Sequence, residues 1–307
     1  MQLGFIGLGT MGRHMALNLL AGGHAMAVFA RRAEAAQPLV DAGATAYDSP
    51  AAVAEHSDVI FTMVTGTRDV QEVLLGGEVR GAGLLVGARP GSLVIDMSTI
   101  DPSATRALAT TLAAAGIDML DAPVSGGPQG AADASLTIMV GGPEPAFERA
   151  RPLFDLLGTT VIHLGPSGAG HTTKACNQLA LLVTAQGTAE ALTLAARCGL
   201  DVEQVRRVLM GGVASSRVLD LFGSRMASRD FRAGIESRLY HKDMNIALSL
   251  GHACGAVLPA AAVTMQFVNG LMGRGRGRDD LSALITVLED AAGGGASDAS
   301  TGSTTDA

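Results

Sequence analysis

Lysine is scarce in this chain, and one lysine lies in a polar run that could do proton chemistry. The 307 residues include 20 arginines but only two lysines, Lys174 and Lys242. Lys174 stands in "GAGHTTKACNQ", three residues before Asn177, so both side chains would share one face of a helix and reach one oxygen-rich substrate. An ammonium can stabilise an oxyanion and then release a proton, whereas the pKa of arginine is too high for that release. Lys174 is therefore a candidate general acid; an ordinary surface lysine and a helix-packing Asn177 are the open alternatives.

The run "DAPVSGG" is a candidate anion site. Its small residues Ser125, Gly126 and Gly127 follow an apolar stretch, where they expose backbone N–H groups and one hydroxyl. We expect them to bind a carboxylate, and an ordinary tight turn is the alternative.

The run "GFIGLGTMG" has the spacing G-x-G-x-x-G. It follows an apolar run, opens a helical segment and leads to a second strand within about 30 residues, which is the context of a dinucleotide-binding loop. A merely structural turn is the alternative. The predicted loop comprises Gly7, Leu8, Gly9, Thr10, Met11 and Gly12.

The second strand ends in "VFARR" and lacks the acidic residue that would bind the ribose 2′-hydroxyl of NAD. Ala30 removes a carboxylate that would repel a 2′-phosphate, and Arg31 and Arg32 can bind one with forked guanidinium groups. We therefore predict NADPH or NADP⁺ as the cofactor, with NAD(H) possible. Solvated arginines at a strand end are the alternative.

Short β-rich runs alternate with helical segments as far as residue 163, which predicts a largely parallel sheet wrapped by helices. The strands are expected at 3–7, 25–30, 58–64, 92–98, 117–123, 135–142 and 160–165. The helices between them are expected at 10–21, 33–42, 67–75, 103–115 and 145–157. A helix over 172–199 and further helical segments follow, and the Gly/Ser/Thr-rich end is expected to be a disordered tail. The predicted domains are 1–163, 164–291 and the tail 292–307.

Composition excludes several classes of protein. The formal charge of −7 gives no basic face for nucleic acid or anionic lipid. Three cysteines without C-x-x-C spacing indicate core packing and a reducing compartment rather than disulfides or zinc, and no metal-ligand set is visible. The N-terminus lacks a signal peptide, and we see no run of the roughly 18 apolar residues that a membrane span needs. These features predict a soluble cytoplasmic protein.

With the glycine loop, "DAPVSGG" and "GAGHTTKACNQ" following one another in this order along the chain, it resembles the β-hydroxyacid dehydrogenase family from residue 2 to about residue 290. The runs "GIDMLDAPVSGG" and "GGVASSRVLD" are most similar to its tartronate semialdehyde reductase branch. The resemblance implies a Rossmann-type N-terminal domain, a long interdomain helix, an all-α C-terminal domain that builds a homodimer or homotetramer, and an active site between the domains.

The resemblance also implies roles for particular residues. Lys174 would be catalytic, Asn177 and the turn at residues 125–127 would bind substrate, and the cofactor contacts would include Met63, Val64, Thr99 and Lys242. An ion pair with Asp243 is the alternative for Lys242. His171, where the family often has Asn, is expected to be a bystander.

Two departures from the family pattern affect the site. Val64-Thr65 replaces a common Leu-Pro, which puts the local cofactor contact in doubt, and Ile235 replaces a common aromatic residue, which puts the pocket size in doubt. The expected activity is NADPH-preferring interconversion of a small carboxylate-bearing aldehyde and its β-hydroxyacid, with tartronate semialdehyde and glycerate first. The alternatives are a 3-hydroxyisobutyrate dehydrogenase, another semialdehyde reductase of the succinic or glyoxylate type, and a non-catalytic NADP-binding module. Sugar-acid decarboxylases would need a larger second domain, and imine reductases usually lack the lysine.

Overall fold

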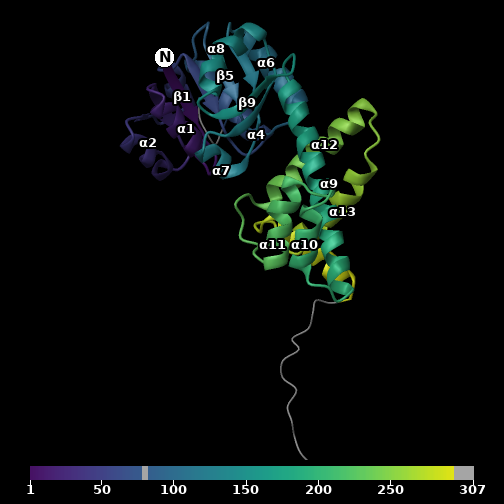
Figure 1. Ribbon diagram of the computed structural model, residues 1–307. Coiled ribbons are helices and arrows are strands. Elements are labelled where there is room, and N and C mark those ends of the chain that lie inside the picture. Colours follow the sequence, from purple (N-terminus) through teal and green to yellow (C-terminus); the bar gives the residue numbers. More distant parts are fainter. Residues whose placement is uncertain (78–81, 294–307) are drawn as a thin grey trace, which may run out of the picture. The chain divides into compact units, whose positions relative to one another are not determined.

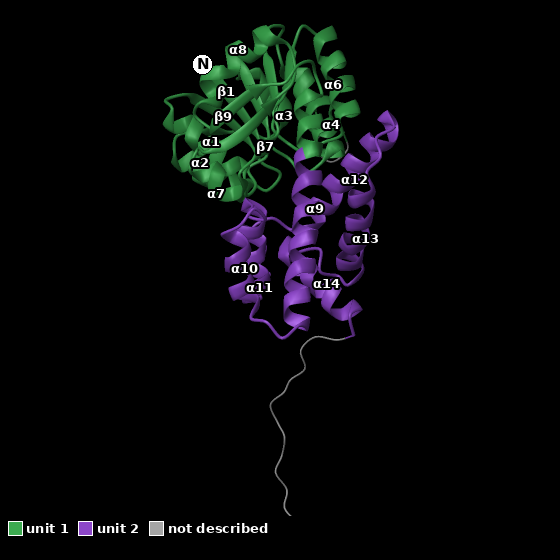
Figure 2. Cartoon of the chain, turned by 45° about the vertical axis from the view of Figure 1, so that its right-hand side comes forward, with its two compact units in different colours: residues 1–176 green, residues 177–307 purple. Residues whose placement is uncertain are grey.

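The computed structural model describes residues 1–77 and 82–293. The chain forms two compact units, Met1–Cys176 and Asn177–Ala307 (Figure 2). The tail expected at 292–307 lies outside the described residues from residue 294 onward.

Unit 1 is built on a six-stranded parallel sheet with the order β3-β2-β1-β4-β5-β6. Figure 1 labels two of its strands, β1 and β5. Alternate residues of its strands enter two separate apolar cores, because successive side chains of a strand point to opposite faces. Leu3 and Phe5 of β1 lie in one core and Ile6 lies in the other. The strands are β1 Gln2–Ile6, β2 Ala25–Phe29, β3 Thr45–Ala46, β4 Val59–Thr62, β5 Leu93–Asp96 and β6 Asp118–Asp121.

Helices connect these strands, as parallel pairing requires. Two of them begin with a side-chain cap followed by proline: Ser49 accepts from the N–H of Ala52, and Asp101 accepts from the N–H of Ser103 at 2.6 Å. The helices of this unit are α1 Gly12–Ala21, α2 Gln37–Asp41, α3 Pro50–Glu55, α4 Thr67–Leu75, α5 Leu84–Gly87, α6 Pro102–Ala114, α7 Gly127–Ala132 and α8 Glu144–Phe154, with a 3₁₀ turn at Ala33–Ala36.

A second, three-stranded sheet contains β7 Val124–Ser125, β8 Leu136–Val140 and β9 Gly158–His163. β7 pairs antiparallel with β8, and β8 pairs parallel with β9. Only two residues separate the end of β6 from the start of β7, so the candidate turn at Ser125 begins close to the end of the main sheet.

Unit 2 is helical. The long helix α9, Ala169–Arg197, begins in unit 1 and continues through unit 2, where its side chains Leu182, Ala185, Ala189 and Leu192 recur at helical spacing and enter the core. The other elements are α10 Val202–Met210, a π-helical turn at Leu219–Gly223, α11 Ser224–Ser228, α12 Ser237–Cys254, α13 Pro259–Gly273, a 3₁₀ turn at Leu281–Ala283 and α14 Leu284–Ala291.

α9 is also apolar enough to pass a test for membrane spans. Within the described part of the chain it is the one helix whose length and composition suffice, with a mean hydropathy of 1.4. Some of its Leu and Ala side chains, such as Leu182 and Leu192, enter the core of unit 2, and 39% of the apolar stretch is buried within the protein.

The predicted fold class is confirmed, with the parallel sheet first, then the long helix and then the helical region. The expected packing of the cysteines is wrong: Cys176, Cys198 and Cys254 are all exposed. Cys176 and Cys254 lie in the helices α9 and α12, and Cys198 lies in the turn after α9; the count and spacing of cysteines do not reveal their exposure.

Candidate active site

The three glycines of the first loop differ in what an added Cβ atom would contact. Gly7 has a φ of +102°, and a Cβ there would collide with the carbonyl of Met63. A Cβ at Gly12 would collide with the carbonyl of Gly7, whereas one at Gly9 would meet nothing within 4 Å. The first glycine therefore permits the turn and the third permits close packing of α1. The second leaves open space where a pyrophosphate could approach the backbone.

The same loop presents backbone donors. None of the N–H groups of Gly9, Thr10 and Met11 donates to another residue that the structure describes, and α1 has no acidic residue in its first turn. Leu8 is buried in the core, so it can offer a ligand only its backbone. Open N–H groups at the positive end of a helix form an anion site.

The other predicted cofactor residues lie where further parallel strands end. Residues 30–32 follow β2, Met63 and Val64 follow β4, and Thr99 lies three residues after β5. The strand order changes direction between β1 and β4, and ligands of open parallel sheets bind at the carboxyl ends of the strands at such a point. Val64, the departure from the family pattern, is held by its N–H, which donates to the hydroxyl of Ser98 at 3.0 Å.

Arg31 and Arg32 are available to an anion. Both are exposed, and neither side chain forms an ion pair or hydrogen bond with another described residue. Most exposed arginines elsewhere in unit 1 do have a partner, such as Arg151, which pairs with Asp155 at 3.2 Å. The absence of partners fits arginines that bind a phosphate.

The structure brings Lys174 to the "DAPVSGG" turn. Its side chain is 7% exposed, and its Nζ donates to the carbonyl of Val124 at 2.7 Å. Val124 directly precedes Ser125, although 50 residues separate it from the lysine in sequence. Burial and this contact show that Lys174 is not an ordinary surface lysine.

The turn has open donors of its own. Gly126 and Gly127 have φ values of +140° and +65°, which explains why both positions are glycine. Neither N–H donates to another residue in the described ranges, and Ser125 is half-buried. Successive N–H groups in such a turn form a concave anion-binding surface.

Four polar residues of unit 2 form a chain of contacts. The side chain of Asn177 donates to Gln178 at 2.9 Å, and that of Gln178 donates to Asp243 at 2.5 Å. The Nζ of Lys242 lies 2.9 Å from the other oxygen of Asp243 as an ion pair whose angle falls short of a hydrogen bond. The ion pair that sequence left open for Lys242 is thus present. Gln178 and Asp243 link Asn177 to Lys242. Gln178 was missed, because only its adjacency to Asn177 pointed to it.

Two further buried groups lie in unit 1 near the start of α9. His171 and Asp121 are almost completely buried, and the Oδ2 of Asp121 accepts from the backbone N–H of His171 at 2.9 Å. Burial raises the pKa of the Asp121 carboxyl above its ordinary value, although the charge of His171 and two backbone donors oppose the rise. Asp121 was missed, and His171 was expected to be a bystander.

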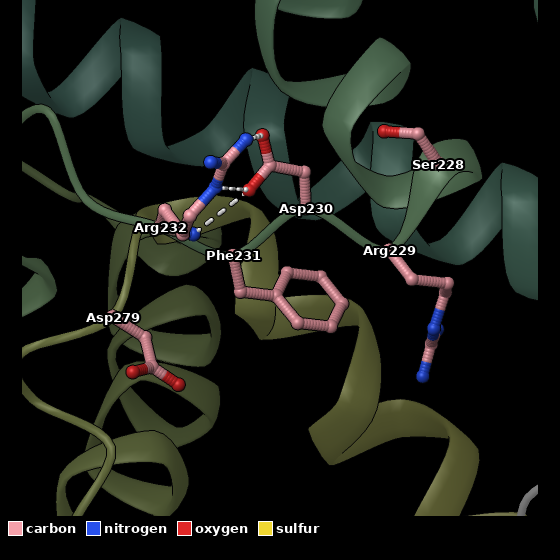
Figure 3. Close-up of a pocket in the computed structure, with 6 residues that line it drawn as sticks. All are labelled: Ser228, Arg229, Asp230, Phe231, Arg232 and Asp279. Atoms are coloured by element: carbon pink, nitrogen blue, oxygen red, sulfur yellow. Dashed lines mark hydrogen bonds and ion pairs between the residues drawn. The ribbon is translucent and has the colours of Figure 1, made fainter.

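The hollow drawn in Figure 3 contains no predicted site residue. It lies in unit 2, has a volume of about 510 Å³ and is open to solvent. Its charges are satisfied within the protein, since Arg232 forms two contacts with Asp230 and Arg229 forms two with Glu289. Ile235, the departure that left the pocket size in doubt, is half-buried and packs against the core of unit 2. The residues that line the hollow are Ser228, Arg229, Asp230, Phe231, Arg232 and Asp279.

Comparison with known proteins agrees with the motifs. Residues 2–165 match the family model for the NAD binding domain of 6-phosphogluconate dehydrogenase, and residues 168–288 match that for NAD-binding of NADP-dependent 3-hydroxyisobutyrate dehydrogenase. The 2-hydroxy-3-oxopropionate reductase of Escherichia coli (strain K12) is 42% identical over 94% of this chain and 97% of its own.

Solved structures resemble the whole fold. The 3-hydroxyisobutyrate dehydrogenase of Salmonella typhimurium has a TM-score of 0.85 and 29% identity, with coverage of 93% of this chain and 99% of that chain. The Mycobacterium tuberculosis 3-hydroxyisobutyrate dehydrogenase, solved with L-serine, has a TM-score of 0.84 and 31% identity, with coverage of 94% and 98%.

Proposed function

Because the chain belongs to the β-hydroxyacid dehydrogenase family and is an NAD(P)-dependent oxidoreductase, we propose that it interconverts 2-hydroxy-3-oxopropionate (tartronate semialdehyde) and glycerate. We propose in addition that it prefers NADPH to NADH. The observation that carries the proposal is the buried Lys174, whose Nζ lies 2.7 Å from the carbonyl that precedes the "DAPVSGG" turn.

The residues present fit a bound dinucleotide. The open space at Gly9 suits a pyrophosphate, and so do the N–H groups of the first loop that donate to no described residue. The side chains of Arg31 and Arg32 suit a 2′-phosphate. In this proposal Met63, Val64, Thr99 and Lys242 contribute to cofactor binding as well. When bound, the reduced nicotinamide would supply a hydride to the aldehyde carbon.

The chain's own residues would bind the substrate and stabilise the negative charge that develops on its aldehyde oxygen. The turn at residues 125–127 would hold the carboxylate through its N–H groups and hydroxyl, and Asn177 would hydrogen-bond another substrate oxygen. As negative charge grows on the aldehyde oxygen, the ammonium of Lys174 would stabilise it and then donate a proton. In the oxidative direction the neutral amine would take the proton from the hydroxyl group.

The second candidate is a 3-hydroxyisobutyrate or L-serine dehydrogenase, which the two structural neighbours favour. The 42% identity with the Escherichia coli reductase favours tartronate semialdehyde. A rate comparison separates these candidates. It would test tartronate semialdehyde, succinic semialdehyde, glyoxylate and the aldehyde of 3-hydroxyisobutyrate with NADPH and with NADH, and L-serine in the oxidative direction.

We expect tartronate semialdehyde with NADPH to have the highest kcat/KM. Glycolaldehyde, which lacks the carboxylate, should be at least about tenfold poorer, since a hydrogen bond to a charged group contributes about 1.5–3 kcal/mol. Comparable kcat/KM values for the two aldehydes would contradict the anion site. A higher value for another acid would replace the proposed substrate, and no turnover with any of them would support a non-catalytic binding module.

A further inference from the structure

The helix that carries Lys174 is capped by a residue from a distant strand. α9 begins at Ala169, and Gly168 before it has no side chain with which to cap a helix. Instead the carboxylate of Asp121, at the end of β6, accepts from the N–H of Gly168 at 2.8 Å and from the N–H of His171 at 2.9 Å. Both carboxylate oxygens are used, and they face the positive end of the helix. Asp121 therefore attaches the first turn of α9 to the sheet.

The ring of His171 makes a second attachment from the same turn. Its Nε2 donates to the carbonyl of Ser98 at 2.9 Å, because a carbonyl can only accept. Its Nδ1 lies 2.7 Å from the hydroxyl of Thr105 in α6. The turn is thereby tied to the segment after β5 and to α6.

Two buried carboxylates flank the ring. Nδ1 lies 3.7 Å from Oδ2 of Asp121, and Nε2 lies 3.7 Å from Oδ2 of Asp96, with all three side chains fully buried. That Asp96 oxygen has no hydrogen-bond partner among the described residues, while its other oxygen accepts from the hydroxyl of Thr62 at 2.7 Å. The ring also makes the hydrogen bonds to the carbonyl of Ser98 and the hydroxyl of Thr105, so replacing it with an apolar group would leave these buried polar groups without that partner.

The backbone leaves little freedom for this turn to shift. A Cβ at Gly170 would collide with the carbonyls of Met139 and Asp121, so the helix start is pressed directly against two strands. The next turn of the same helix carries Lys174, three residues after His171. A displacement of the first turn would therefore move the ammonium relative to the carbonyl of Val124.

We propose that Asp121 and His171 are positioning residues that hold the ammonium of Lys174 at the "DAPVSGG" turn. We call Asp121, His171, Ser98 and Thr105 the α9 anchor. The inference rests on the proposed function, since it assigns these residues to the site in which Lys174 acts. Neither side chain touches substrate in this account; both act through the helix.

Kinetics of matched variants give the first test. His171→Leu fills similar space without hydrogen bonds, whereas His171→Gln keeps one donor and one acceptor for Ser98 and Thr105. We expect His171→Leu to lower kcat about 10²-fold, because a misplacement of about 1 Å can cost that much, while the Kd of NADPH stays within about twofold. His171→Gln should recover most of the loss.

Two controls keep this test sharp. Thr105→Val removes the hydroxyl contact with Nδ1, together with a 3.1 Å contact to the carbonyl of Asp101 at the start of α6. It should lower kcat by a smaller factor, so it tests the anchor even if His171→Leu does not fold. Ser57→Ala removes an equally buried hydroxyl, which donates to the carbonyl of Val53 at 2.7 Å before β4, and should leave kcat unchanged. A similar loss in Ser57→Ala would mean that general destabilisation causes the effect and would overturn the proposal.

The scarcity of lysine allows a second test that needs no activity. Protein labelled with lysine carrying ¹³C only at Cε should give two lysine signals in an NMR spectrum, which Lys242→Arg assigns. In Thr105→Val and His171→Leu the Cε signal of Lys174 should move while that of Lys242 stays in place. If the folded variants leave the Lys174 signal and kcat unchanged, the anchor does not position the lysine. A wild-type protein inactive on every aldehyde would refute the proposed function, and the NMR result would still decide the anchor.

Discussion

At the scale of the residue, the two lysines of the chain occupy defined positions. Lys174 is 7% exposed and contacts a backbone carbonyl, and the side chain of Lys242 is 27% exposed and pairs with Asp243. In a chain with 20 arginines, a buried lysine beside the proposed anion-binding turn fits a need for a proton that can be released.

Arg31 and Arg32 should determine the choice of cofactor. Replacing both with alanine should raise the KM for NADPH far more than the KM for NADH, because only NADPH carries the 2′-phosphate that the guanidinium groups would bind. Steady-state kinetics with both cofactors measure this. Arg151→Ala removes an exposed cation with an ion pair from the same unit and should change neither KM. Equal increases for NADPH and NADH in the double variant would rule out a 2′-phosphate site.

Asp121 should make stability depend on pH with an unusual sign for a carboxyl group. Burial raises its folded-state pKa above the ordinary 3.8, so above that pH the unfolded chain loses the proton first. Stability therefore falls as pH rises through this window. The difference in unfolding free energy between wild type and Asp121→Asn should be largest at and below the ordinary pKa of 3.8 and should narrow as pH rises above it.

Chemical denaturation at several pH values measures that difference. Asp118→Asn changes an exposed carboxyl on the same strand and should show no such trend. A difference that widens with pH would mean that the native state favours the ionised Asp121, contrary to the effect of burial.

At the scale of the element, the first βα turn makes opposite predictions for two of its glycines. Gly12→Ala should destabilise the fold by about 1–3 kcal/mol, since the new Cβ collides with the carbonyl of Gly7. Gly9→Ala should leave stability nearly unchanged, because nothing lies within 4 Å, but it should weaken NADPH binding by filling the space of the pyrophosphate.

Thermal unfolding and cofactor titration of the two variants check this pair. NADPH affinity that is unchanged in Gly9→Ala would show that the dinucleotide does not approach the loop at this glycine. A stable Gly12→Ala protein would show that α1 can move away from the turn.

The sequence predicted the main elements because they have strong local patterns. Apolar runs such as residues 58–64 and 92–98 became β4 and β5, and the Ala/Leu-rich stretch became α9. The short elements α3, α5 and α7 and the strands β3 and β7 were not predicted, because elements of two to six residues leave little periodicity.

The candidate site was predictable where residues of one motif act together. The glycine loop and the "DAPVSGG" turn are local, so spacing sufficed. The contacts of Asp121 with Gly168 and His171 join residues 47 and 50 positions apart, and only the fold brings them together. The same reason hid the link between Gln178 and Asp243.

At the scale of the whole molecule, charge and composition bound how the protein meets its ligands. The net charge of −7 opposes an anionic substrate, so in the proposed function binding would come from local donors such as the turn at Ser125 and the side chain of Lys174. Self-association remains a prediction. It is supported by large apolar side chains exposed on unit 2, which include Leu194, Leu200, Val208 and Val213.

Light scattering measures the molar mass in solution and checks the expected homodimer or homotetramer. A mass of two or four times 31.1 kDa is the expected result. A mass equal to that of one chain would contradict it.

The central claim is that Lys174 delivers a proton to the substrate oxygen, and a single-turnover measurement on Lys174→Arg tests it most directly. Arginine keeps the positive charge but does not release a proton readily. With enzyme and NADPH mixed in excess over tartronate semialdehyde, we expect NADPH oxidation to slow by about 10²–10⁴-fold, the usual contribution of general acid catalysis. The Kd of NADPH should stay within about twofold of wild type, because the glycine loop that would bind the phosphates connects β1 to α1 and does not include the lysine. A Lys174→Arg protein that oxidises NADPH at a near-normal rate would show that the lysine acts only through its charge, and that the proton comes from another group.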